Sequence, residues 1–167
     1  MLIDQSFFVG EILVPNLTGV GPIPAGNVEE LNRFISKYEP EFLDEVLGPD
    51  LSAAFQTGIS AATPEQRWVD LKLKLVNATR KESAIAGYVY YHFYRDRLST
   101  SSGLGEIEST AENANVVLNT DKMARAYNDA VRKGRAVFNW VVENAETYPE
   151  FDLEHEYTLS PVNTFGI

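Results

Sequence analysis

The chain has 167 residues, of which 44% are hydrophobic and 23% charged, and it contains no cysteine. This length and apolar content predict one folded domain with its own core. The lack of cysteine excludes disulfide bonds, thiolate zinc sites, iron–sulfur clusters and cysteine nucleophiles. The first residues do not have the pattern of a signal peptide, and no apolar stretch reaches the roughly 20 residues that a membrane span needs.

The formal charge of −10 is unevenly distributed along the chain. Residues 1–66 carry 10 acidic and 2 basic side chains, residues 67–135 carry 8 and 12, and residues 136–167 carry 6 and none. Because affinity for DNA comes from cationic residues, DNA binding is not expected as the main task, although an acidic DNA mimic stays open. We weigh an ordinary solvated acidic surface against acidic ends that contact the basic middle of a neighbouring copy.

Residues 1–26 are rich in glycine and proline, which predicts an irregular N-terminal arm with short extended pieces at Phe7–Gly10 and Glu11–Pro15. A helical pattern begins after Asn27, a suitable N-cap, and apolar residues follow at spacings of three and four. Pro40 has the position of a first-turn proline, and the apolar stripe continues beyond it.

Gly48 predicts the end of this helical stretch, and Pro49 begins a short helix that ends at Gly58. The sequence Thr63–Gln66 combines an N-cap, a proline and capping-box spacing. It predicts a helix that begins at its proline and ends at about Val76.

Residues 82–98 predict an unusual helix, because aromatic and aliphatic residues cover most of its circumference. Such a helix is either central in the fold or shared with a partner. Tyrosine combines an apolar ring with a polar tip, which suits a surface that is buried on association, but simple core burial is the alternative. We expect Phe93 to lie in the core, and Tyr90 or Tyr94 to be the more tolerant sites.

Ser99–Asn119 is rich in serine, threonine, glycine and asparagine, and its alternating pieces Leu104–Glu108 and Ala114–Leu118 predict a short β-hairpin. A helix, the longest expected, follows over 120–145 with Thr120 or Asn119 as its cap. Residues 146–167 look like an extended acidic tail. The sequence thus predicts a mainly α protein: a bundle of about five helices over 27–145, with a small β-hairpin and extended N- and C-terminal arms.

Few residues point to catalysis or ligand binding. The only histidines are His92, expected as a packed core residue, and His155, expected as a solvated tail residue. Gly19–Gly21 and Gly103–Gly105 do not complete a phosphate-binding fingerprint, and neighbouring carboxylates on helices diverge rather than converge. We therefore predict no catalytic residue, no metal site and no cofactor.

Four parts of the sequence carry a family resemblance: FISKYEPEFLDEVLGPDL, RWVDL, IAGYVYYHFYRDRLSTSSGLGEIESTAENANVV and a long helix that begins near KMARAYNDAV. Their order, a helix-turn-helix start, an aromatic central helix, a Ser/Thr/Gly loop with a glutamate-rich turn and a long final helix, resembles the small helical head-tail connector (adaptor) proteins of tailed phages and prophages. The resemblance covers about residues 27–145. The N-terminal arm and the acidic tail lie outside it.

The resemblance implies a structural virion protein without enzymatic activity, which forms a homo-oligomeric ring below the portal and joins the DNA-filled capsid to the tail. Its partners would be further copies of itself, the portal protein and tail or neck proteins, with DNA passing by without specific binding and no membrane involved. Its location would be the virion neck, and the host cytoplasm during assembly. The candidate interface residues are Tyr90, Tyr91, Tyr94, Arg95, Arg97, Arg132, Lys133 and Arg135.

Within this set, Arg132 and Arg135 are three residues apart on one helix, with Lys133 flanking them, so a single contact patch is geometrically possible. Two alternatives stay open. One is a small helical enzyme or ligand-binding protein with a pocket between the aromatic helix and the Gly103–Gly105 loop. The other is an acidic regulatory protein that binds one host partner.

Overall fold

The computed structural model describes residues 1–97, 100–102, 105–107 and 120–163, the two short ranges by their backbone alone. The α-helices are α1 (Pro22–Leu47), α2 (Pro49–Ile59), α3 (Gln66–Leu75), α4 (Ala84–Arg97) and α5 (Thr120–Glu143). Two 3-10 turns, η1 (Gln5–Phe7) and η2 (Gly10–Ile12), precede them. Antiparallel strand pairs are formed by β1 (Val76–Asn77) with β2 (Glu82–Ser83) and by β3 (Thr100–Ser102) with β4 (Gly105–Ile107). The predicted mainly α fold with a small hairpin is confirmed.

Helix α1 is longer than the sequence pattern predicted. It begins at Pro22, inside the predicted arm. The first N–H groups of a helix have no helical partner, so proline, which has no N–H group, is well suited to this position. Pro40 lies in the interior of the helix rather than in a first turn. The helix continues past Pro40 because Phe42 and Leu43, in the turn after it, are fully buried. As a result α1, not α5, is the longest helix.

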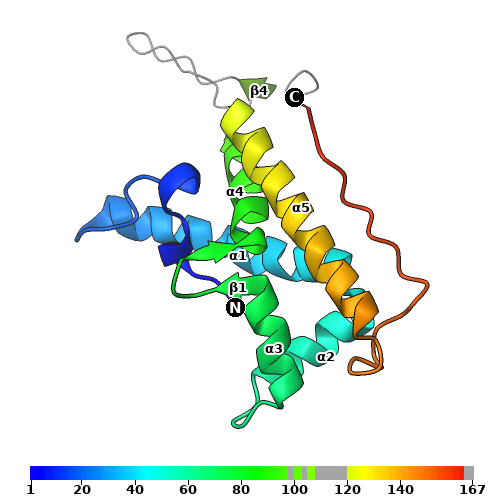
Figure 1. Cartoon of the computed structure of the whole chain (residues 1–167). Coiled ribbons are helices and arrows are strands. Elements are labelled where there is room, and N and C mark those ends of the chain that lie inside the picture. Colours follow the sequence, from blue (N-terminus) through cyan, green and yellow to red (C-terminus); the bar gives the residue numbers. More distant parts are fainter. Residues whose placement is uncertain (98–99, 103–104, 108–119, 164–167) are drawn as a thin grey trace.

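Helix α4 lies at the centre of the core. It packs most extensively along α5 and also crosses α1, and Figure 1 shows α4 and α5 passing steeply through the molecule while α1 runs across it. Gly87 allows the closest approach, since a Cβ atom at this position would lie 2.8 Å from the carbonyl oxygen of Ala126 and 3.3 Å from the Cβ of Ala130. Small residues on both helices therefore set the distance between them.

The hairpin after α4 has a different register from the predicted one. Thr100 pairs with Ile107 and Ser102 with Gly105, whereas the predicted second strand at Ala114–Leu118 lies outside the described residues. The β1–β2 ribbon, which connects α3 to α4, was not predicted from the sequence. Helix α3 begins at Gln66 with Glu65 as its N-cap, two residues after the predicted first position.

The N-terminal arm is part of the folded body. The Glu39 carboxylate, which is buried on α1, accepts hydrogen bonds from the backbone N–H groups of Leu2 at 2.8 Å and Ile3 at 3.2 Å. Burial raises the pKa of this carboxyl group, although these hydrogen bonds act in the opposite direction. Phe7 and Phe8 then enter the core. The arm is irregular, as predicted, but it is firmly attached to α1.

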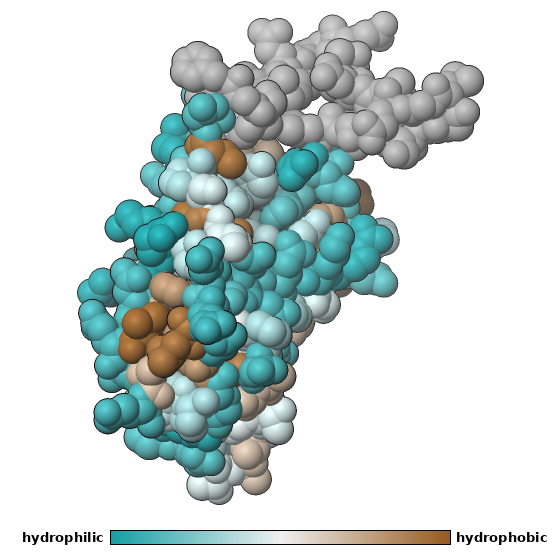
Figure 2. All heavy atoms as spheres, turned by 90° about the vertical axis from the view of Figure 1, so that its right-hand side faces the viewer, coloured by the Kyte–Doolittle hydropathy of each residue, from teal (hydrophilic) through white to brown (hydrophobic). Residues whose placement is uncertain are grey.

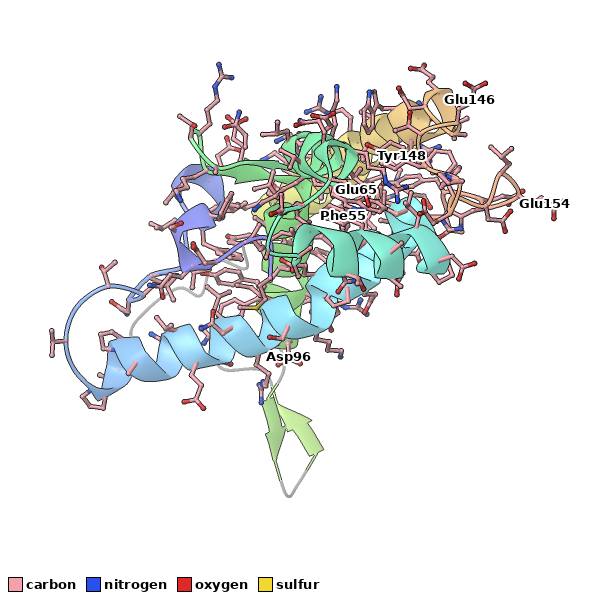
Figure 3. The ribbon with its side chains drawn as sticks, turned by 90° about the horizontal axis from the view of Figure 1, so that it is seen from below. Phe55, Glu65, Asp96, Glu146, Tyr148 and Glu154 are labelled. Carbon is pink, nitrogen blue, oxygen red and sulfur yellow. The ribbon has the colours of Figure 1, made fainter. Side chains whose placement is uncertain are left out.

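The C-terminal segment also packs on the helices. Tyr148 is fully buried and donates a hydrogen bond to the carbonyl oxygen of Arg67 at 2.8 Å, while the Arg67 guanidinium group binds both carboxylate oxygens of Glu150 at 2.9 and 3.0 Å. Figure 3 shows Tyr148 inside the molecule and Glu146 at its edge. Phe151 adds a second buried aromatic ring.

Beyond this anchor the segment is extended and lies along α5 (Figure 1). The Tyr157 hydroxyl donates to the carbonyl oxygen of Val131 at 2.7 Å and lies where a Cβ atom on Gly134 would be 2.7 Å away. The side chain of Asn128 both donates to the carbonyl oxygen of Val162 and accepts from its N–H, each at 2.8 Å. The predicted acidic tail is thus extended, but it is attached to the chain's own helices.

The contact of α4 with α5 can be tested with Gly87→Ala. The added methyl group would meet backbone, which cannot move away cheaply, so we expect the free energy of unfolding to fall by about 1–3 kcal/mol in chemical denaturation. Gly26→Ala is the matched control, because this exposed helical position in α1 has open space around it. Alanine should leave stability unchanged or raise it by up to about 1 kcal/mol there. Equal effects of the two variants would contradict the proposed packing.

Candidate interaction surfaces

The structure divides the predicted aromatic interface between core and surface. Tyr90 is 1% and Tyr91 7% exposed, so both rings belong to the core of this chain and form no surface on it. Phe93 is fully buried, as expected. Tyr94 is half-buried, with its ring centroid 4.6 Å from that of Tyr90. Of the two positions expected to be the more tolerant, Tyr90 is buried and Tyr94 is not, so we now expect only Tyr94 to be tolerant.

The two arginines at the end of α4 are exposed, but they have different surroundings. Arg97 forms an ion pair with Glu30 of α1, and its guanidinium carbon lies 4.1 Å from the ring centroid of Phe93. Arg95 lines a polar hollow beside α1. Of the predicted residues on this helix, Tyr94, Arg95 and Arg97 are therefore the ones accessible to another molecule.

The three basic residues predicted as one patch on α5 do not share one set of neighbours. Arg132 and Lys133 both form ion pairs with Asp129. Arg135 donates to the carbonyl oxygen of Leu159, and its guanidinium carbon lies 4.6 Å from the ring centroid of Tyr157. Successive helical residues are rotated by about 100°, which separates Lys133 from Arg135. Arg135 therefore binds the chain's own C-terminal segment.

His92 is packed, as the sequence predicted. Its ring stacks on Tyr38 with centroids 4.0 Å apart and planes 13° apart. Its Nε2 atom is buried and has no hydrogen-bond partner among the described residues. Burial lowers the pKa of His92 to about 4; Arg95 and Lys37 act in the same direction, and the charge of Glu41 opposes it. Together with Asp96 these side chains line a polar hollow of about 440 Å³ between α1 and α4.

His155 differs from its prediction as a solvated tail residue. Its Nε2 lies 3.1 Å from the carbonyl oxygen of Glu45, and its ring would lie 3.3 Å from a Cβ atom at Gly48, which has φ +75°. The imidazole therefore fills the corner between α1 and α2.

A largely apolar hollow lies between α3, the β1–β2 ribbon and α5. It has a volume of about 420 Å³, and Val137 and Trp140 of α5 and Leu73 of α3 form its apolar lining. Lys74 lies beside it, with its Nζ atom 4.9 Å from the ring centroid of Trp140. Lys133 also lines this hollow, which we call the ribbon hollow.

A second hollow, of about 360 Å³, continues from the first, because both are lined by Glu82, Ser83 and Lys133. Across the two hollows the charged side chains are five basic and three acidic ones: Lys74, Arg80, Lys81, Arg125 and Lys133, and Glu11, Glu82 and Asp129. This side of α5 therefore has a net positive charge.

The end of α5 and the segment that follows it are acidic, and the part of this segment around Phe151 and His155 packs on the side of α5 away from the hollows. Residues 143–163 contain six carboxylates and no lysine or arginine, and five of the six are exposed: Glu143, Glu146, Asp152, Glu154 and Glu156. Leu153, between two of them, is 71% exposed. Figure 2 views this side of the molecule and shows a mostly hydrophilic surface with a compact hydrophobic patch in its lower half. We call residues 150–156, which pack on Phe138 through Phe151 and His155, the acidic face.

Of the residues that form these two surfaces, Lys133 was singled out from the sequence, whereas Leu73, Trp140 and Leu153 were not. Leu73 lies between Lys72 and Lys74 in the sequence, and Leu153 lies between Asp152 and Glu154. Each leucine could therefore have been recognised as an apolar residue with charged neighbours. The hollow itself was not visible, because α3, the ribbon and α5 are separated in the sequence and meet only in the fold.

The burial of Tyr90 can be measured against its half-buried neighbour. Tyr90→Ala should lower the free energy of unfolding by about 3 kcal/mol or more, because it leaves a cavity in the core. Tyr94→Ala should cost about 1 kcal/mol, since its ring is partly solvated already. Urea denaturation of both variants decides. A smaller loss for Tyr90→Ala than for Tyr94→Ala would contradict this placement.

The environment of His92 predicts a pH dependence of stability. The folded chain binds the imidazole proton only near pH 4, whereas the unfolded chain binds it near pH 6.5. The contribution of neutral His92 to the free energy of unfolding is therefore complete above pH 6.5 and is lost as the pH falls towards 4. His92→Phe keeps the aromatic packing without a titratable group. Between pH 6.5 and 4, wild type should lose more unfolding free energy than His92→Phe, and equal losses would refute the effect.

Among the described residues, no group of three or more histidine or acidic side chains is placed to hold a metal ion. Within the same residues, no helix is both long enough and apolar enough to cross a membrane. A scan of protein-family models and searches of curated proteins and of solved structures found no match to this chain.

Proposed function

We propose that this chain is a head-tail connector of a tailed phage or prophage, which forms a ring below the portal and joins the DNA-filled capsid to the tail. The observation that carries the proposal is the presence of an acidic face and a positively charged pair of hollows on opposite sides of α5. Two different, complementary surfaces on one chain suit head-to-tail contacts, which close into a ring when the rotation between copies allows it. The sequence resemblance over residues 27–145 supports the same function.

The distribution of charge supports this role in a second way. The chain as a whole carries −10, so a ring of several copies has a strongly negative charge. A negative channel repels the phosphate backbone and lets DNA pass without binding, whereas a cationic one would retain it. Opposite charges between neighbouring copies also guide the approach of subunits during assembly.

The proposal predicts binding to portal-bearing particles. The purified chain should bind as a closed ring to DNA-filled capsids that carry the portal but no neck, taken from the phage or prophage that encodes it. Negative-stain images should show the ring, and about 1 M salt, where the Debye length falls to about 3 Å, should weaken its formation. A chain that stays monomeric and does not bind the capsids would refute the proposal. A one-to-one complex with a host protein would instead favour the regulatory alternative.

Charge-reversed variants provide a matched control. Arg80→Glu with Arg125→Glu reverses two charges beside the second hollow, and Arg33→Glu with Lys37→Glu makes the same change in net charge on α1. Exposed charges contribute little to folding, so both variants should fold. Only the first should fail to form rings. The triple reversal at Arg132, Lys133 and Arg135 is less suitable, since Arg135 binds the C-terminal segment.

A further inference from the structure

We propose that Leu153 on the acidic face of one copy inserts into the ribbon hollow of the next copy, with Lys74 of the hollow facing the carboxylates beside Leu153. This inference rests on the proposed ring and names the contact between its subunits. Neither surface is covered by another part of the described chain.

The inserted side chain is presented by a rigid support. Leu153 follows Phe151, which is buried, and precedes His155, which is held at the carbonyl oxygen of Glu45. The backbone N–H of Glu154 donates to the Asp152 side chain at 2.9 Å, which fixes the turn around Leu153. Figure 3 shows Glu154 at the periphery of the molecule. An exposed leucine in an ordered turn loses little conformational freedom on binding.

The receiving hollow has a matching composition. Its floor is apolar, with Val137 buried and Trp140 partly exposed, and Leu73 on its edge is 68% exposed. Burial of two exposed leucines and part of an indole ring against one another removes apolar surface from water. The volume of about 420 Å³ is large enough for one leucine side chain with its flanking backbone.

The charges around the two surfaces are complementary. Leu153 has Asp152 and Glu154 as neighbours, and Glu156 is also exposed in the same segment. Lys74 beside the hollow forms no ion pair with a carboxylate among the described residues, whereas Lys133 is partly neutralised by Asp129. Of the two cations that line the ribbon hollow, Lys74 is therefore the one more available to a partner. Glu82 on the ribbon opposes the contact, so Lys74 and the apolar insertion must outweigh it.

The placement of the two surfaces on α5 excludes a simple two-fold dimer. The hollow uses positions 133, 136, 137 and 140, whereas Phe151 and His155, on either side of Leu153, pack on position 138. At 100° per residue position 138 lies on the opposite side of the helix from the hollow. Each copy therefore has one inserted side chain on one side and one hollow on the other, which is the arrangement that continues head to tail from copy to copy.

Cysteine cross-linking tests the contact directly, because the native chain has no cysteine. Full-length Leu153→Cys and Leu73→Cys variants are mixed at low salt, at about 100 µM each, and treated with a mild oxidant. We expect a disulfide-linked dimer between the two variants, at least tenfold more abundant than the dimers that each variant forms with itself. Both positions are exposed, so neither substitution should affect folding.

A pair with Val20→Cys sets the background, since Val20 is fully exposed in the loop before α1 and takes no part in the proposed contact. If Leu153→Cys cross-links to Val20→Cys as readily as to Leu73→Cys, or mainly to itself, the proposal is overturned. The proposal is also overturned if Leu153→Cys and Leu73→Cys form no cross-link above this background.

A charge exchange tests the electrostatic part. Glu154→Lys and Lys74→Glu should each weaken self-association by about tenfold in sedimentation experiments, and the double variant should recover most of that loss. Additive effects without recovery would contradict pairing of these residues. Rings that form on portal-bearing capsids without the 153–73 cross-link would overturn this contact and leave the connector function standing. A cross-link in a chain that ignores such capsids would support the contact and refute the connector function.

Discussion

The backbone contact between α4 and α5 at Gly87 is the constraint on which the rest of the fold depends. Because Gly87 has no side chain, Ala126 approaches it directly, and α4 is enclosed by α5 on one side and by α1 on another. An enclosed helix must be apolar all round, which explains why Tyr88, Tyr90 and Tyr91 are buried rather than presented to a partner. The two proposed contact surfaces consequently lie outside α4, on the two sides of α5 and at the β1–β2 ribbon that leads into α4.

The two chain ends are attached to the helices by different kinds of interaction. The N-terminal arm is fixed by one buried carboxylate, Glu39, which satisfies two backbone N–H groups at the beginning of the chain. The C-terminal segment is fixed by aromatic anchors, with Tyr148 in the core and Tyr157 against the notch at Gly134. The acidic ends thus meet basic residues of their own chain, as Glu150 does with Arg67. The unequal charge along the sequence becomes, in three dimensions, two surfaces of opposite sign.

Local pattern in the sequence was enough to predict the helices, their approximate ends and the small hairpin. It failed where the deciding interaction is long-range. The Gly/Pro-rich stretch before Asn27 has the composition of a loop, yet Pro22 begins a helix that the buried side chains further along it stabilise. The apolar pattern of α4 could not separate central burial from association, since both bury the same side chains. The ribbon hollow combines residues from three segments, and no spacing along the chain encodes that meeting.

The paired hydrogen bonds between Asn128 and Val162 have an evolutionary consequence. The side-chain amide contacts only backbone atoms, so it recognises where position 162 lies and not which amino acid occupies it. Substitutions at Ser160 or Pro161, which are exposed, should therefore accumulate freely among relatives. An insertion or deletion between Tyr157 and Val162 would instead move the backbone away from Asn128. The contacts of Asn128 therefore constrain the length of this segment more strongly than its composition.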